Sequence, residues 1–214
     1  MDAQFWINAW NEGRTGFHQS EYHHQMVKFF PRLNLQEGKS ILVPLCGKTK
    51  DMLWLKSQKL TVHGVELYEG AVQEFFKENH LSFSKSRTDH FTEYMGENIT
   101  VSCGDFFKLG KHEAYDFIYD RASLVALPKE MRTTYAQVVI DALKPAGEYL
   151  LIVYEYNQNQ LSGPPFSISD EEINDLFGNK FSISKMEVEE ASKSGKFSEL
   201  DYFLEKTFVL EKNA

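Results

Sequence analysis

The chain has 214 residues, 42% of them hydrophobic, which is enough to bury one sizeable core, so we expect one domain over residues 1–214. Asp and Glu outnumber Lys and Arg by 31 to 23, and the net charge of -8 disfavours a nucleic-acid partner because phosphate backbones are also negative. Two cysteines are too few for a disulfide-stapled secreted domain, and no apolar run reaches the roughly 20 residues of a membrane span, so we expect a cytoplasmic protein without membrane partners.

Residues 1–36 are expected to form an N-terminal extension before the first strand. Aromatic residues recur between Trp6 and Gln19 without an evident helical period, which suits a lid that orders over a ligand. A helix is predicted from about Ser20 to Phe30, with the Ser20 hydroxyl placed to cap the N–H groups of its first turn.

Strands and helices alternate after this extension. The predicted strands are Ser40–Leu45, Thr61–Leu67, Ile99–Ser102, Tyr115–Tyr119 and Glu148–Tyr156, and the predicted helices are Lys48–Gln58, Gly70–Glu78 and Glu130–Leu143. The segment Ser82–Glu97 is polar and punctuated, and we assign it to an irregular excursion. Such alternation implies a mainly parallel sheet with right-handed crossovers.

The last part of the chain has a different pattern. Phe181–Val188 and Leu200–Leu210 are strand-like and are joined by the polar stretch Glu189–Glu199, with no helix between them. Only antiparallel neighbours can be joined so simply. The predicted fold class is therefore α/β: a Rossmann-like, mostly parallel sheet of about seven strands, with helices on both faces and a C-terminal antiparallel hairpin.

Two residues at predicted strand ends indicate a nucleoside site. Gly47 follows the first strand, where the backbone can approach a ligand, but the three-glycine pattern of pyrophosphate binding is absent. Glu66 ends the second strand, nineteen residues later, where an acid can accept both hydroxyls of a ribose. A plain turn at Gly47 and a solvated carboxylate at Glu66 are the alternatives. A ribose-binding acid without a pyrophosphate loop favours S-adenosylmethionine over NAD.

The next two strand ends add further candidates. Asp105 and Phe106 follow the third parallel strand, where a carboxylate and an aromatic ring suit an adenine, although Asp105 alone could be a turn residue. Arg121 follows Asp120 at the end of the fourth, where it could hold a carboxylate or stabilise a substrate anion. A simple surface pair between Asp120 and Arg121 is the alternative.

Several short segments, taken in order and spacing, resemble those of the thiopurine S-methyltransferase family. They are Trp6 and Trp10, Gly13–Gln19, Pro44–Lys48, Gly64–Glu66, Asp120–Ala122 and Gly163–Phe166. The resemblance implies a class I methyltransferase fold whose N-terminal segment folds over the cofactor. It further implies that the S-adenosylmethionine contacts are Trp10, Leu45, Glu66 and Arg121, with Asp105 and Phe106 at the adenine-side positions.

On the substrate side, the resemblance places Phe17 at the border of the pocket, and we expect His18 to line it as well. Tyr119 stands where the family usually has Trp, and the C-terminal stretch where some members place a substrate-side arginine offers only Lys193 and Lys196. The resemblance implies a small thiol as the substrate, and we expect Arg121 to act as the catalytic cation.

The sequence indicates neither a nucleophilic cysteine nor a metal site. Cys46 lies in the cofactor turn, but no neighbouring base or cation is apparent that would make its thiol a nucleophile. His18, His23 and His24 lack an accompanying Cys or carboxylate at metal-ligand spacing, so we predict no metal site.

The sequence therefore predicts a monomeric S-adenosylmethionine-dependent enzyme that methylates the sulfur of thiopurine-like, aromatic or heterocyclic thiols. A halide, thiocyanate, selenium or tellurium acceptor would require the same cofactor residues and stays open. A non-catalytic cofactor sensor and a nicotinamide-dependent oxidoreductase are the alternatives from other classes, the latter disfavoured by the missing glycines.

Overall fold

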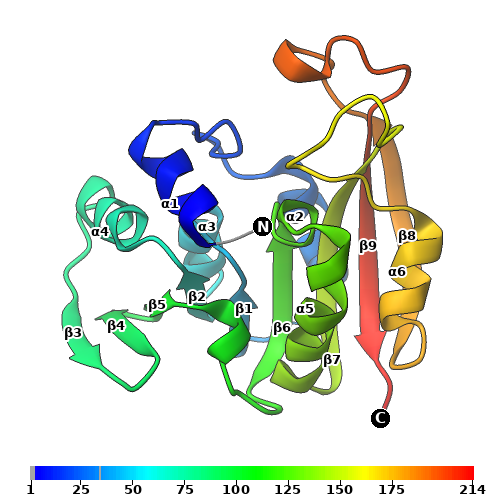
Figure 1. The fold of residues 1–214 in the computed structure, drawn as a ribbon. Coiled ribbons are helices and arrows are strands. Elements are labelled where there is room, and N and C mark those ends of the chain that lie inside the picture. The colour runs from blue at the N-terminus through cyan, green and yellow to red at the C-terminus, as the bar shows by residue number, and fades with distance from the viewer. Residues whose placement is uncertain (1–2, 34) are drawn as a thin grey trace.

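The predicted alternation of strands and helices assembles into one nine-stranded sheet in the computed structural model, which describes residues 3–33 and 35–214 (Figure 1). The strands are β1 (Ser40–Val43), β2 (Thr61–Glu66), β3 (Ser84–Arg87), β4 (Phe91–Gly96), β5 (Ile99–Gly104), β6 (Tyr115–Arg121), β7 (Leu143–Glu155), β8 (Phe181–Glu190) and β9 (Leu204–Lys212). The helices are α1 (Ala3–Asn11), α2 (His24–Phe29), α3 (Asp51–Ser57), α4 (Glu69–Glu78), α5 (Lys129–Ala142) and α6 (Asp170–Phe177).

The strand order is β3-β4-β5-β2-β1-β6-β7-β9-β8. Strands β5, β2, β1, β6 and β7 are parallel to one another, whereas β3, β4, β8 and β9 pair in antiparallel fashion. This arrangement confirms the predicted Rossmann-like sheet and its C-terminal antiparallel pair. Strand β2 lies on one side of β1 and β6 lies on the other. The order of the strands therefore reverses between β1 and β6.

The predicted count of about seven strands was too low, and the antiparallel share is larger than expected. The segment Ser82–Glu97 is not irregular, because it contains the hairpin of β3 and β4. Every residue of β3 is exposed, so this edge strand lacks the apolar alternation by which strands are recognised. In β4 only Phe91 and Tyr94 are buried.

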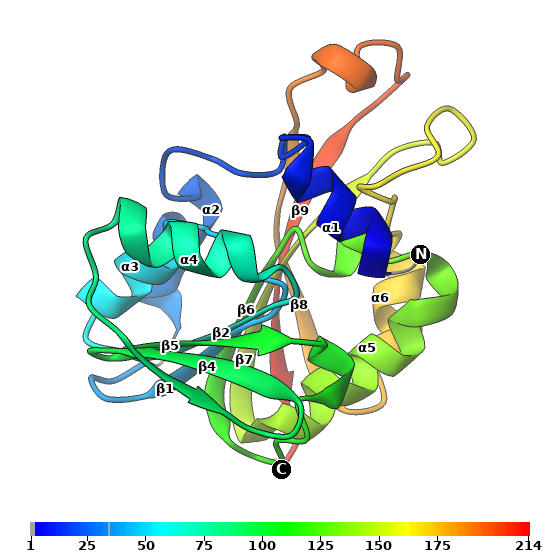
Figure 2. The same cartoon turned by 60° about the vertical axis from the view of Figure 1, so that its left-hand side comes forward.

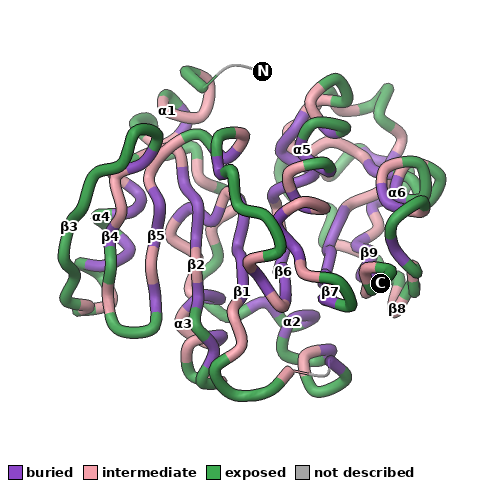
Figure 3. The backbone as a smooth tube through the Cα atoms, turned by 90° about the horizontal axis from the view of Figure 1, so that it is seen from below, coloured by how far each residue is buried: buried purple, intermediate pink, exposed green. Residues whose placement is uncertain are grey.

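Helices cover both faces of the sheet, as predicted (Figure 3). Adjacent residues of β1 show the division, since Ile41 packs in one core with α2, α3 and α4, and Leu42 packs in the other with α5 and α6. Strands buried on both sides read as continuous apolar runs, which is why the sequence located the central strands well. None of the helices in residues 3–33 and 35–214 has the length and apolar character needed to cross a membrane.

The N-terminal extension differs from the prediction. Ala3–Asn11 is helical although no helical period was evident, and its one buried residue is Ala9. The next helix begins at His24 rather than Ser20, and the Ser20 side chain is exposed and does not cap it. Helices this short are marginal in isolation, so contacts with the rest of the protein must hold them in place.

One end of the sheet gathers segments that are distant in the chain. Figures 1 and 2 show α1, the connection after β7 and the connection between β8 and β9 at this end, above the carboxyl ends of the parallel strands. The loops after β1, β2 and β6 emerge at the same end, because parallel strands point the same way. The fold therefore concentrates the strand-end residues and the N-terminal extension in one region.

A buried carboxylate fixes the end of β6. Asp120 is fully buried and accepts hydrogen bonds from the Tyr135 and Tyr149 hydroxyls at 2.6 and 2.7 Å. Its other oxygen accepts weaker bonds from the backbone N–H groups of Ser123 and Leu124 at 3.2 and 3.3 Å. Asp120 thus joins α5, β7 and the loop after β6 instead of pairing with Arg121 at the surface.

We expect Asp120→Ala to lower the free energy of unfolding by about 3–5 kcal/mol, because it leaves buried hydroxyl and backbone donors without acceptors. Denaturant-induced unfolding measures the change. Asp201→Ala removes an exposed carboxylate and should change the same quantity by less than about 0.5 kcal/mol. A loss below about 1 kcal/mol for Asp120→Ala would show that the network contributes little to stability.

Candidate functional site

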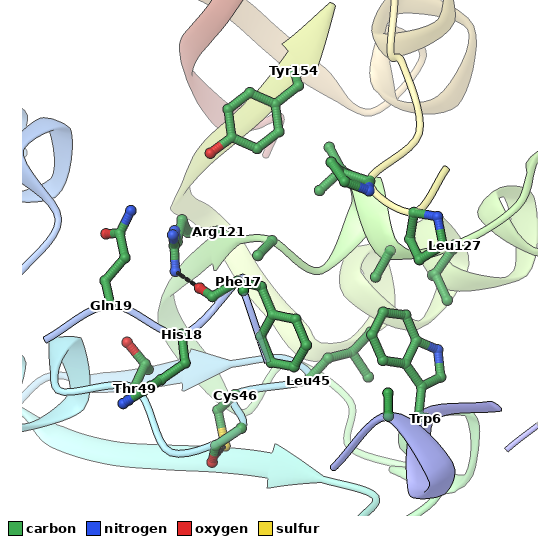
Figure 4. Close-up of a pocket in the computed structure, with 18 of the residues that line it drawn as sticks. Trp6, Phe17, His18, Gln19, Leu45, Cys46, Thr49, Arg121, Leu127 and Tyr154 are labelled. Carbon is green, nitrogen blue, oxygen red and sulfur yellow. Dashed lines mark hydrogen bonds between the residues drawn. The ribbon is translucent and has the colours of Figure 1, made fainter. Parts of the chain in front are cut away.

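A cavity of about 1240 Å³ lies at the carboxyl ends of β1, β2, β5 and β6, beneath α1 and the loop that follows it. This position is where open α/β sheets bind ligands, since the strand order reverses between β1 and β6. Pockets for one small molecule typically measure about 300–1,000 Å³, so the cavity has room for a nucleoside cofactor and a small second ligand. Figure 4 shows part of its wall.

The structure brings together all eight site residues predicted from the sequence. Each of them lines the cavity: Trp10, Phe17, His18, Leu45, Glu66, Asp105, Phe106 and Arg121. They come from the N-terminal extension and from the ends of four parallel strands. What each of them binds stays a prediction. Their hydrogen bonds, burial and charge indicate which ligand groups each of them could contact.

Glu66 connects the loops that follow β1 and β2. One carboxylate oxygen accepts a hydrogen bond from the Gly47 N–H at 2.9 Å, and the other accepts one from the Tyr68 N–H at 2.7 Å. Burial raises the pKa of Glu66, and the backbone N–H groups of Tyr68, Gly47 and Leu67 oppose this effect. A carboxylate oxygen can accept two hydrogen bonds, so each retains a site for a ligand hydroxyl.

The lack of a side chain at Gly47 lets the N-terminal helix α1 pack closely on the loop after β1. Gly47 has φ +53°, and a Cβ added there would lie 3.1 Å from the Trp10 ring. The Trp10 ring also stacks on Tyr68, with centroids 6.0 Å apart and planes at 13°. The Tyr68 hydroxyl donates to the Asn11 side chain at 2.6 Å. These contacts hold the C-terminal end of α1 over the ends of β1 and β2.

Arg121 makes the corresponding connection on the β6 side. Its Nη1 donates to the backbone oxygen of Phe17 at 2.8 Å, as Figure 4 shows, and its Nε is buried without a hydrogen-bond partner among the described residues. The guanidinium has five N–H groups, so it retains donors for an anionic ligand. Phe17 in turn meets Trp10 edge-on, with centroids 5.4 Å apart.

Strained backbone marks both sides of the strand-order reversal. Leu45 after β1 has φ +43° and Ala122 after β6 has φ +65°, although neither is glycine. L-residues adopt this region at a cost, and such residues cluster at ligand sites. Leu45 and Ala122 both line the cavity, at the ends of the neighbouring strands β1 and β6.

The two adenine-side candidates, Asp105 and Phe106, differ in how exposed they are to the cavity. Asp105 is exposed and accepts from the Phe107 N–H at 3.0 Å, so it also caps the turn that follows β5. Phe106 is only 2% exposed and packs against Tyr135, so little of its ring is free for stacking. Phe107 also lines the cavity and is half-buried, although no motif in the sequence pointed to it.

Two side chains near the strand ends are held in their neutral forms. Burial, assisted by Lys48, lowers the pKa of His18. Burial and the nearby Glu66 raise the pKa of the Cys46 thiol well above its usual range. A protonated, buried thiol is a poor nucleophile, which agrees with leaving Cys46 without a catalytic assignment.

The opposite wall of the cavity contains Tyr154 and Glu205, which the sequence did not indicate as site residues, and Lys196, one of the two lysines in the stretch where some family members place a substrate-side arginine. Tyr154 is from β7, Glu205 is from β9, and Lys196 lies between β8 and β9. Burial and Glu205 raise the pKa of Tyr154 to about 12, while burial lowers the pKa of Lys196. Tyr154 and Glu205 are cross-strand partners in the antiparallel pair of β7 and β9, so no local motif signals them.

The whole chain resembles one family of enzymes. Residues 1–213 match the family described as thiopurine S-methyltransferase. A thiopurine S-methyltransferase of Nitrosospira multiformis is 43% identical over 185 residues, which cover 86% of this chain and 84% of that protein. One from Photobacterium profundum is 34% identical over 212 residues, which cover 99% of each chain.

Solved structures agree on the fold. A 1,6-didemethyltoxoflavin-N1-methyltransferase of Burkholderia thailandensis, solved with bound S-adenosylhomocysteine, superposes with a TM-score of 0.68 at 14% identity and covers 99% of this chain and 87% of that one. A SAM-dependent methyltransferase from Methanosarcina mazei gives a TM-score of 0.67 at 17% identity over 90% of this chain and 99% of the other. With its sheet, its strand-end residues and its full-length relatives in agreement, the chain belongs to the thiopurine S-methyltransferase family.

Proposed function

We propose that this protein transfers the methyl group of S-adenosylmethionine to the sulfur of small aromatic or heterocyclic thiols. The observation that carries the proposal is the meeting of two arrangements in one cavity: Glu66 with Gly47 on the β2 side, and Arg121 with Phe17 on the β6 side. When bound, S-adenosylmethionine supplies an electrophilic methyl group on a sulfonium sulfur.

The β1–β2 side of the cavity suits the adenosine. The free acceptor sites of Glu66 can take the ribose hydroxyls, and the absence of a Cβ at Gly47 lets Trp10 pack closely beside them. Asp105 and the aromatic residues after β5 border the region expected for adenine, with Phe107 offering more exposed ring than Phe106.

The acceptor side is bordered by Phe17, His18 and Arg121. A nearby cation lowers the pKa of a thiol, so Arg121 favours the thiolate without a dedicated base. His18 has a lowered pKa, so it adds no positive charge near neutral pH and serves as a polar wall. Holding sulfur and methyl in line can contribute about 7–11 kcal/mol, more than a general base typically supplies, so positioning is the main catalytic effect.

Three further expectations stay predictions. All nine strands of the described chain belong to one sheet, which supports one domain over residues 1–214. The packing of α1 on the strand ends supports the role of the N-terminal extension as a lid. A cytoplasmic monomer remains our expectation from the sequence.

Incubation with labelled S-adenosylmethionine and a panel of acceptors tests the proposed reaction. Aromatic and heterocyclic thiols should yield S-methyl products, identified by mass, with turnover well above that of the matching alcohols. A main product from halide, thiocyanate, selenium or tellurium species would favour the alternative acceptors. The absence of any methylated thiol would contradict the proposal.

Glu66→Gln should weaken the binding of S-adenosylhomocysteine roughly 10- to 100-fold, because charge-assisted hydrogen bonds contribute about 1.5–3 kcal/mol. Titration calorimetry measures the dissociation constant. Glu97→Gln, at an exposed turn position outside the cavity, is the matched control and should bind like the unmodified protein. Thermal unfolding without ligand separates a local loss of binding from a loss of fold, and unchanged affinity in Glu66→Gln would refute the assigned role.

Arg121→Ala should lower kcat/KM for thiol methylation roughly 10- to 100-fold, through loss of a charge-assisted interaction. The reduction should be larger for weakly acidic thiols, because they depend most on the cation to form a thiolate. Arg121→Lys, which keeps the charge but not the planar fork, should recover part of the activity. The control is Arg87→Ala on exposed β3, and equal kcat/KM in Arg121→Ala and the control would exclude a catalytic role.

A further inference from the structure

A cluster of two imidazoles and one carboxylate lies in the wall of the cavity, and the proposed methyl transfer does not use these side chains. His23 and His24 stand at the start of α2, and Glu205 is on β9. One ligand atom from each residue lies within 4.8 Å of the others. Glu205 Oε2 is 3.4 Å from His23 Nε2, and Glu205 Oε1 is 3.9 Å from His24 Nε2.

The carboxylate of this cluster is buried and incompletely satisfied. The Glu205 side chain is 8% exposed, and its Oε1 has no hydrogen-bond partner within the described chain. A buried carboxylate oxygen without a hydrogen-bond partner is costly, and a bound ion is one of the few features that explain it.

The spacing of the cluster suits ligands that share an ion better than a direct hydrogen bond. Hydrogen bonds between N–H and O are typically about 2.7–3.2 Å long, shorter than the 3.4 Å between His23 Nε2 and Glu205 Oε2. Two ligands about 2.0–2.2 Å from a tetrahedral zinc ion are about 3.4 Å apart. The two imidazole rings, 5.0 Å apart and inclined at 29°, face the same carboxylate.

We propose that His23, His24 and Glu205 bind one divalent transition-metal ion of the zinc type. Two imidazoles and one carboxylate form a ligand set that zinc uses when its fourth position stays open. All three residues line the cavity, so the ion would lie in its wall. Imidazole donors favour Zn²⁺, Co²⁺ and Ni²⁺ over Mg²⁺ and Ca²⁺, which prefer oxygen.

The contact between His24 and Glu189 is the interaction that the ion would replace. His24 Nε2 contacts a carboxylate oxygen of Glu189 at 2.5 Å, and a nitrogen that binds a metal must first lose its proton. The Glu189 side chain is partly exposed, so it can turn toward solvent or toward a metal-bound water. The site does not depend on the proposed thiol substrate, because its ligands and their geometry belong to the free protein.

Calorimetric titration of chelator-treated, desalted full-length protein with Zn²⁺ tests the proposal. Excess Mg²⁺ is present throughout to suppress unspecific binding to the acidic surface. We expect one Zn²⁺ per chain, and with Co²⁺ in its place we expect the visible absorption of a tetrahedral nitrogen and oxygen site. His24→Asn should weaken Zn²⁺ binding by at least the roughly 10- to 100-fold loss seen when a mere partner of a metal ligand is removed.

The choice of variants keeps the result interpretable. The His24 side chain is 61% exposed, so His24→Asn should leave the fold intact, as circular dichroism can verify. Glu205→Gln and His23→Asn should show the same loss, whereas His112→Asn removes an exposed imidazole elsewhere and should bind Zn²⁺ like the unmodified protein. Absence of binding, or equal binding by His24→Asn and His112→Asn, would overturn the proposal and leave the cluster as an ion pair.

Discussion

The ligand end of this protein depends on one buried carboxylate that joins two neighbouring strand ends. Glu66 bonds to the Gly47 and Tyr68 N–H groups, which fixes the loops after β1 and β2 relative to each other. Because Trp10 packs on both Gly47 and Tyr68, the same carboxylate also determines where α1 can rest. The residue expected to bind ribose is therefore also the residue that shapes the site around it.

The end of β6 uses the alternation of a strand for the same purpose. Successive side chains point to opposite faces, so Asp120 enters the core and bonds to Tyr135 and Tyr149, while Arg121 reaches the cavity and bonds to Phe17. The buried anchor Asp120 and Arg121, the cation proposed for catalysis, are thus adjacent in sequence and separate in space. Such support from an immobile neighbour is what positions a catalytic group to within the tolerance that methyl transfer requires.

The sequence predicted those parts of the protein whose signals are local. Central strands are continuous apolar runs, and strand-end residues such as Glu66 and Arg121 follow from the topology of parallel sheets. The hairpin of β3 and β4 escaped because its edge strand is exposed throughout. Helix α6 was also missed, although Ser169 caps it by accepting from the Glu172 N–H, a pairing that the sequence displays.

The remaining differences between the predictions and the structure arise from contacts between segments that are distant in the chain. The cavity has two walls that differ in how they are built. The cofactor side is built from strand ends of the parallel sheet, where a change at Glu66 would disturb the backbone of two loops. The far side includes residues of α2, β7, β9 and the β8–β9 connection, such as Tyr154, Glu205 and Lys196. We therefore expect substitutions on this far side to alter acceptor choice, or the proposed ion site of His23, His24 and Glu205, while the side proposed for the cofactor stays unchanged.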